Sequence, residues 1–105
     1  MPGALTPTEV VNAWDAGADF IKIFPADSMG GAKYLKSLKA PLPQIKLIPT
    51  GGVSQSTAAD FIMAGAEAVG VGADLVDIKA IKEGRPGDIT AAARKYLKIV
   101  KEARG

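Results

Sequence analysis

The chain has 105 residues, which is enough for one domain or part of one. Its apolar content of 48% is ample for a buried core, and its formal charge of +2 is too small to indicate a nucleic-acid partner. It has no cysteine and no histidine, which excludes disulfides, thiolate metal sites, cysteine nucleophiles and Ser-His triads. Any catalysis must therefore use lysine, carboxylates, hydroxyls or backbone amides.

The first half of the chain predicts two helices around one strand. The segment Thr6–Glu9 has the pattern of a capping box with proline at the first helical position, and it predicts a helix that extends past Trp14. The apolar run Phe20–Phe24 predicts a strand. A second helix is expected to begin at Gly30-Gly31 and to end before Pro41, because proline cannot continue a helix.

The second half repeats this alternation. The segments Lys46–Thr50 and Ala68–Gly72 predict two further strands, Ser54 is a candidate cap for a third helix, and the last helix is expected to begin near Asp88. Successive strands lie roughly 22 to 26 residues apart, the length of one strand plus one helix. Such alternation predicts a parallel sheet with right-handed crossovers.

The number of predicted strands bears on the architecture. A (β/α)8 barrel needs about eight strands and typically ~250 residues. The three predicted strands and the stub Met1–Gly3 therefore amount to about half of one. We expect an α/β fold of the (β/α)8 TIM-barrel type, of which residues 1–105 form a part as one domain. No apolar run reaches the ~18 residues of a membrane span and no signal-peptide pattern opens the chain, which favours a soluble cytoplasmic protein without a membrane partner.

The strand Phe20–Phe24 carries the most informative side chain. Because side chains alternate along a strand, Phe20, Lys22 and Phe24 share one face. If both faces of the sheet are covered, desolvation favours the neutral amine of Lys22, which can attack a ketone to form an imine. The structural alternative is a lysine near a strand end that reaches solvent or pairs with a buried carboxylate.

Two glycine-rich corners follow the next strands. The segment Pro49–Gly52 ends one strand just before a helix, where backbone N–H groups and the helix dipole attract an anion. The segment Gly70–Ala73 ends the following strand in the same way. Together they fit a phosphate-binding corner, although each alone also fits a tight turn. The second corner lacks the third glycine and the downstream acid of a dinucleotide fingerprint, so NAD is not expected.

The remaining candidate polar residues are aspartates and a serine. Asp27 and Ser28 follow the lysine strand, where they fit either a substrate contact or an ordinary turn. Asp74 and Asp77 are expected in a short helix after the last strand. No spacing of carboxylates resembles a metal site, so neither a metal nor another cofactor is predicted.

Six motifs along the chain carry a family resemblance. In order they are Met1-Pro2-Gly3, Thr6-Pro7-Thr8-Glu9, Lys22-Ile23-Phe24-Pro25-Ala26, Gly30-Gly31, Pro49-Thr50-Gly51-Gly52-Val53 and Val69-Gly70-Val71-Gly72. This ordered set resembles the second half of the 2-keto-3-deoxy-6-phosphogluconate (KDPG) aldolase/4-hydroxy-2-oxoglutarate aldolase family over essentially the whole chain. The resemblance implies that the chain runs from the end of the fifth barrel strand through the eighth helix.

The resemblance also implies residue roles. Lys22 matches the imine-forming lysine of a class I aldolase, which needs no cofactor. The threonine at position 50 resembles the residue of the gluconate-type enzyme rather than that of the galactonate-type enzyme. The residues implied to contact the substrate are Pro2, Phe24 and Thr50, and those implied to hold its phosphate are Gly51, Gly52, Gly72 and Ala73. The implied reaction is cleavage of KDPG into pyruvate and glyceraldehyde 3-phosphate by a protein that is a homotrimer when complete.

Two departures from the family pattern keep other readings open. Ala73 stands where many members have a serine whose hydroxyl contacts the phosphate. The family's general acid/base glutamate and its substrate-binding arginine belong to the first half of the barrel and have no counterpart here. The alternatives are a non-catalytic half-barrel that only folds or self-assembles, and a phosphate-binding module of another barrel enzyme.

Overall fold

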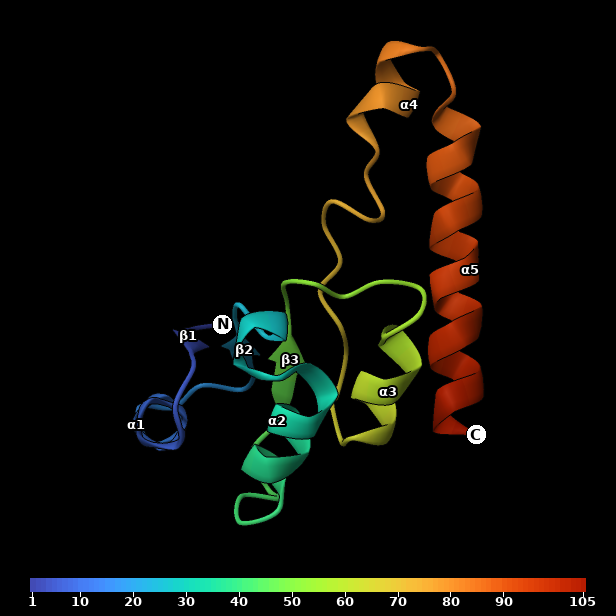
Figure 1. Ribbon diagram of the computed structural model, residues 1–105. Coiled ribbons are helices and arrows are strands. Elements are labelled where there is room, and N and C mark those ends of the chain that lie inside the picture. Colours follow the sequence, from blue (N-terminus) through green and yellow to red (C-terminus); the bar gives the residue numbers. More distant parts are fainter.

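A three-stranded parallel sheet organises the chain, and the computed structural model describes all of its residues, 1–105 (Figure 1). The strands are β1 (Gly3–Ala4), β2 (Ile21–Ile23) and β3 (Leu47–Pro49), in the spatial order β1-β2-β3. Both pairings are parallel, with Lys22 opposite Gly3 on one side and Ile48 on the other. The predicted alternation of strands and helices is therefore confirmed, as an α/β unit that does not by itself close a barrel.

Helices connect and follow these strands. They are α1 (Pro7–Asp15), a 3-10 turn η1 (Asp27–Met29), α2 (Gly31–Lys39), α3 (Ala58–Met63), α4 (Ile78–Lys82) and α5 (Pro86–Arg104). The second predicted helix begins and ends as expected, since Gly30 adopts a left-handed conformation before α2 and the helix ends ahead of Pro41. The side-chain hydroxyl of Tyr34 on α2 donates to the carbonyl of Leu5, 2.5 Å away, and ties α2 to the β1–α1 connection.

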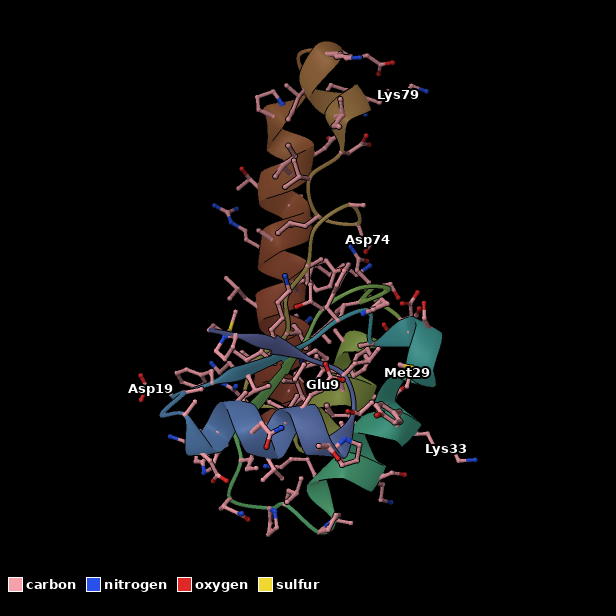
Figure 2. All side chains as sticks on the ribbon, turned by 90° about the vertical axis from the view of Figure 1, so that its left-hand side faces the viewer. Glu9, Asp19, Met29, Lys33, Asp74 and Lys79 are labelled. Carbon is pink, nitrogen blue, oxygen red and sulfur yellow. The ribbon has the colours of Figure 1, made fainter.

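The start of α1, where Figure 2 labels Glu9, has the predicted capping box. The backbone N–H of Glu9 donates to the hydroxyl of Thr6 over 3.4 Å, and the N–H of Thr6 donates to the Glu9 carboxylate over 3.1 Å. These bonds satisfy two helix N–H groups that have no partner inside the helix. The Thr6 hydroxyl also donates to the Glu9 carboxylate over 2.9 Å, and this bond, followed by the one from the Thr6 N–H, holds the pKa of Glu9 below its ordinary value of 4.5.

The two faces of the sheet differ in burial. Ile21, Ile23 and Leu47 are 0% exposed and join the core. The core residues contributed by the helices include Val10, Leu35, Leu38, Ala58 and Phe61. On the other face Phe20 is 39% and Phe24 is 53% exposed, because no helix covers it. The predicted alternation along β2 is confirmed, but the expected cover on both faces is not present in this chain.

The predicted strand at Ala68–Gly72 is wrong as a full strand. One isolated parallel bridge links Gly70 to Thr50. The backbone N–H of Glu67 donates to the carbonyl of Leu47 and that of Gly70 to Pro49, over 3.0 and 2.9 Å. The segment therefore follows β3 but has no strand on its other side, and a parallel ladder paired on one side only is weakly held.

Two smaller predictions also need correction. Ser54 does not cap α3: its carbonyl accepts from Thr57 and Ala58 in a turn that precedes the helix. Asp74 lies in a turn rather than in a helix, whereas Asp77 is the N-cap of α4 and accepts from the Lys79 N–H over 2.9 Å. Local polar side chains offer the backbone these turn and cap geometries in place of helix.

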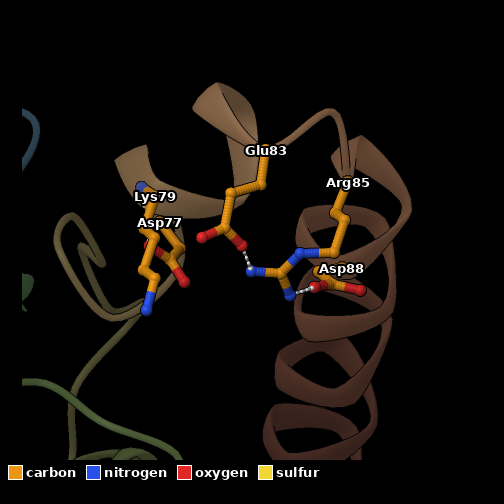
Figure 3. A network of polar contacts seen from close by, with 5 residues as sticks. All are labelled: Asp77, Lys79, Glu83, Arg85 and Asp88. Atoms are coloured by element: carbon orange, nitrogen blue, oxygen red, sulfur yellow. Dashed lines mark hydrogen bonds and ion pairs between the residues drawn. The ribbon is translucent and has the colours of Figure 1, made fainter.

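The last helix begins at Pro86, two residues before Asp88, because proline is well suited to the first helical position. Helices α4 and α5 form an arm whose tip lies far from the sheet (Figure 1). There Arg85 bonds Glu83 and Asp88, each over 2.5 Å (Figure 3). These three side chains are about half exposed, so the network contributes only a little stability. At the other end of the arm α5 packs on α3.

None of these helices has both the length and the apolar character that crossing a membrane would need.

Removal of the Thr6 hydroxyl tests the capping box. Thr6→Ala is expected to lower the free energy of unfolding by about 1 kcal/mol at pH 7, measured by urea denaturation. Because the folded-state pKa of Glu9 is lowered, the bonded form is stabilising above pH 4.5 and this contribution is lost as the pH falls through the lowered value. The deficit of the variant is therefore expected to shrink in acid. Thr8→Ala, at an exposed neighbouring position, is the control, and an equal loss in both variants would contradict the assignment.

Candidate functional site

The side chain of Lys22 lies on the open face of β2. It is half-buried, and its Nζ lies 5.1 Å from the centroid of the Phe24 ring on the same face. The backbone N–H of Lys22 donates to the carbonyl of Pro2 over 2.9 Å, which places Pro2 beside the lysine. Three residues that the sequence predicts for the substrate site are thus neighbours across β1 and β2.

No carboxylate is paired with this lysine. The salt bridges of the chain involve Glu83, Asp88 and Glu102, all of which lie on or next to the α4–α5 arm. The structural alternative of a lysine held by a buried acid is therefore not what the structure shows. A second lysine, Lys46, shares the open face and lies over Phe20, with its Nζ 5.7 Å from the ring centroid. Lys22 differs from it in being half-buried and next to Phe24 rather than Phe20.

A cleft of about 590 Å³ opens at the carboxyl ends of β2 and β3. Its lining residues are Phe24, Thr50, Gly51, Gly52, Val53, Ser54, Gly70, Gly72, Ala73 and Asp74. All four residues predicted to hold phosphate belong to this lining, together with Phe24 and Thr50. Lys22 and Pro2 are not part of the lining. The Nζ of Lys22 lies over the ring of Phe24, which does line the cleft.

Close packing explains why glycines form the wall of this cleft. Gly51 and Gly52 have φ values of 93° and 70°, a region that side chains disfavour. A Cβ on Gly52 would lie 2.3 Å from the Cβ of Asp27, and one on Gly70 would lie 2.4 Å from the hydroxyl of Thr50. At Gly52 and Gly70, neighbouring side chains therefore occupy the space that a larger residue would need.

Backbone hydrogen bonds fasten the two loops that carry the cleft. The N–H of Ala26 donates to the carbonyl of Thr50 over 2.9 Å, and that of Asp27 donates to Gly51 over 3.3 Å. These bonds continue the pairing of β2 and β3 beyond the strands. The loop that follows the lysine strand therefore holds the double-glycine corner in a fixed position relative to Lys22, as a pre-formed binding site requires.

Asp74 is the one ionisable residue of the lining, and it was not among the predicted site residues. The hydroxyl of Tyr96, from α5, donates a hydrogen bond to the carboxylate of Asp74. Burial, and next the bond to Asp74, raise the pKa of Tyr96 far above its ordinary value. The sequence predicts Asp74 in a short helix and gives no local signal that its side chain meets Tyr96, which lies 22 positions further along the chain.

Comparison with known proteins matches this geometry to one family. A family model described as KDPG and KHG aldolase matches residues 1–92. The 2-dehydro-3-deoxy-6-phosphogalactonate aldolase of Escherichia coli is 38% identical over 104 residues, which are 97% of this chain and 48% of that protein. The chain thus spans about half the length of the curated relatives it matches.

Solved structures give the same result. A KDPG aldolase from Legionella pneumophila, with pyruvate captured as a covalent carbinolamine intermediate, superposes with a TM-score of 0.80 at 28% identity, over 94% of this chain and 47% of that one. A cube-shaped protein cage designed by fusing symmetric oligomeric domains superposes with a TM-score of 0.82 at 34% identity, over 98% of this chain and 37% of that one. These neighbours carry the TIM-barrel fold to which the three-stranded unit corresponds in part.

Substitution of Gly52 tests the packing of the cleft wall. Gly52→Ala is expected to lower the free energy of unfolding by roughly 2 to 4 kcal/mol, because its Cβ would overlap Asp27 at a positive φ. Gly72→Ala is the matched control, since a Cβ there meets nothing within 4 Å and φ is not positive. Its expected loss is less than about 1 kcal/mol. Equal losses in urea denaturation would show that the close approach of Gly52 to Asp27 does not constrain the loop.

Proposed function

Because the chain belongs to the KDPG and KHG aldolase family, we propose that it carries the imine-forming half of a class I aldolase site with Lys22 as the nucleophile. The observation that supports this most is the position of the lysine. Lys22 is half-buried, forms no ion pair with an acid, and lies next to Phe24, which lines the glycine-walled cleft. Schiff-base chemistry uses the amine of such an unpaired lysine as its nucleophile.

The chemistry begins at the keto group of a 2-keto-3-deoxy sugar acid. The neutral amine of Lys22 attacks the C2 carbonyl to give a carbinolamine, which loses water to form an imine. The imine accepts the electron pair of the C3–C4 bond as that bond breaks, while the C4 hydroxyl loses its proton and becomes an aldehyde. Protonation of the resulting enamine at C3, followed by addition of water, releases pyruvate and restores the lysine.

The proton steps need a second group besides the amine of Lys22. The C4 hydroxyl must give up a proton and C3 must receive one, which calls for a general acid/base within hydrogen-bond reach. No acidic side chain forms an ion pair with Lys22. We therefore propose that full turnover also requires the other half of the barrel to supply that group, whereas imine formation depends on residues of this chain.

KDPG is the substrate that we propose first. Thr50 at the cleft favours a gluconate-type substrate, and a KDPG aldolase is among the solved structures that match. The phosphate would lie at the glycine corners, against the N–H groups of Gly51, Gly52, Gly72 and Ala73. Alanine at 73 leaves only a backbone donor there. The products would be pyruvate and glyceraldehyde 3-phosphate. A cytoplasmic location fits this reaction and stays a prediction.

Trapping with pyruvate and borohydride tests Lys22. Reduction of an imine is expected to add one pyruvate-derived increment to the chain, assigned to Lys22 by peptide mapping after intact-mass measurement. Lys22→Arg is expected to lose this labelling, because the guanidinium stays protonated. Lys46→Arg is the matched control on the same open face and is expected to keep it. Labelling scattered over surface lysines, or equal in both variants, would contradict the proposed nucleophile.

A second candidate function is a self-associating half-barrel without turnover. The observation in its favour is the open sheet face with exposed Phe20 and Phe24, next to the unpaired outer edge of β1. Exposed edges and apolar faces of this kind favour pairing with another chain. A second copy, in a dimer or a larger homo-oligomer such as a trimer, would bring an equivalent face.

Sedimentation equilibrium tests this second candidate. Phe20→Ser is expected to weaken self-association roughly tenfold, because it removes an aromatic group from the open face. Leu97→Ser is the control, since Leu97 is 72% exposed on α5, a separate element. A monomer at all concentrations, or equal weakening by both variants, would rule out association through the sheet face.

A further inference from the structure

The cleft at the ends of β2 and β3 has one ionisable residue in its lining, and that residue is acidic. Asp74 lies beside Gly72 and Ala73, and the lining includes no lysine or arginine. Figure 2 shows Asp74 on the segment that leads from the sheet to α4. A phosphate in this cleft would meet backbone N–H groups on the glycine walls and a carboxylate on the same rim. Two negative groups in one site repel each other.

The charge of Asp74 has no neutralising partner within the chain. Every salt bridge that the chain forms lies elsewhere, at Glu83, Asp88 or Glu102. The one side chain that bonds Asp74 is Tyr96, whose hydroxyl donates to it. Because the pKa of Tyr96 is raised, this hydroxyl stays protonated and neutral at physiological pH. It orients the carboxylate without removing its charge.

The position of Asp74 is fixed by the core rather than by the loop alone. Tyr96 is only 6% exposed and belongs to the main hydrophobic cluster. Its ring reaches Asp74 from α5, which packs on α3, so the carboxylate is held from outside the loop. An orientation fixed in this way keeps the acid at the rim of the cleft when a ligand enters.

We propose that Asp74 is a specificity-determining residue for the tail of the substrate, which disfavours a phosphate dianion and favours an uncharged hydroxylated tail. This inference rests on the proposed aldolase function and concerns the end of the substrate remote from Lys22. A carboxylate accepts hydrogen bonds from hydroxyl groups, whereas a phosphate dianion offers it only acceptors. The glycine corners still attract a phosphate, so Asp74 sets how strongly a phosphorylated tail is preferred.

Inorganic phosphate is the simplest probe of this subsite. Titration of the full chain, followed by the amide NMR signals of Gly51, Gly52 and Gly72, measures phosphate affinity at the cleft. Asp74→Asn is expected to tighten binding about tenfold, a change of about 1.4 kcal/mol. Asparagine keeps an acceptor for the Tyr96 hydroxyl, so the local fold is expected to persist.

Two control variants separate this effect from general ones. Asp77→Asn removes a charge three residues away that is outside the cleft lining, and asparagine still caps α4. It is expected to change phosphate affinity less than twofold. Tyr96→Phe removes the hydrogen bond but keeps the charge of Asp74, and it is not expected to reproduce the gain. Equal gains in the Asp74 and Asp77 variants, no gain in either, or shifts confined to amides outside the cleft would each overturn the proposal.

Trapping on Lys22 separates failure of this proposal from failure of the proposed function. Pyruvate has no tail, so its reduction onto Lys22 is expected to be unchanged in Asp74→Asn. The ratio of trapped KDPG to trapped 2-keto-3-deoxygluconate, its unphosphorylated counterpart with an uncharged hydroxyl tail, is expected to rise about tenfold in the same variant. Absence of all trapping would refute the nucleophile and leave the phosphate titration to decide on Asp74. Normal pyruvate trapping with an unchanged ratio would refute the role of Asp74 alone.

Discussion

The alternation of side chains along β2 gives the sheet one face that packs in the core and one open face that carries Lys22. The remaining features of the molecule depend on that division. Ile21 and Ile23 are 0% exposed beneath the helices, so the side chains between and beside them must lie on the opposite face. A shift of one residue in register would bury Lys22 in the core at a large energetic cost. The apolar pair therefore determines where the candidate nucleophile lies.

Parallel pairing extends this constraint to the cleft. Because β2 and β3 run in the same direction, their carboxyl ends meet, and the loops that follow them become neighbours. The hydrogen bonds from Ala26 to Thr50 and from Asp27 to Gly51 then hold the two loops together. The glycines serve this arrangement by allowing close approach, at Gly52 to Asp27 and at Gly70 to Thr50. The strand β2, which carries Lys22, and the glycine-rich corners thus form one pre-arranged unit.

Local signals predicted well those elements that local interactions fix. The capping box of α1, the glycine start of α2 and the alternation along β2 all depend on residues close in sequence, and the structure has them as expected. The segment Ala68–Gly72 was predicted as a strand from the same kind of pattern. A strand also needs neighbours, however, and this segment has β3 on one side and none on the other. The amino-acid composition of the segment does not indicate that this second neighbouring strand is absent.

The contact between Tyr96 and Asp74 shows why part of the candidate site lay beyond sequence reasoning. The two residues are 22 positions apart, Asp74 on a turn and Tyr96 on a helix, and neither segment carries a sequence motif that indicates a function. Only the packing of α5 on α3 brings the tyrosine hydroxyl to Asp74, which lines the cleft. A helix stripe that is apolar by pattern therefore carries a polar tip into the binding region, as a buried tyrosine hydroxyl needs a partner. The same tyrosine thus belongs to the core and orients the charged side chain of the cleft.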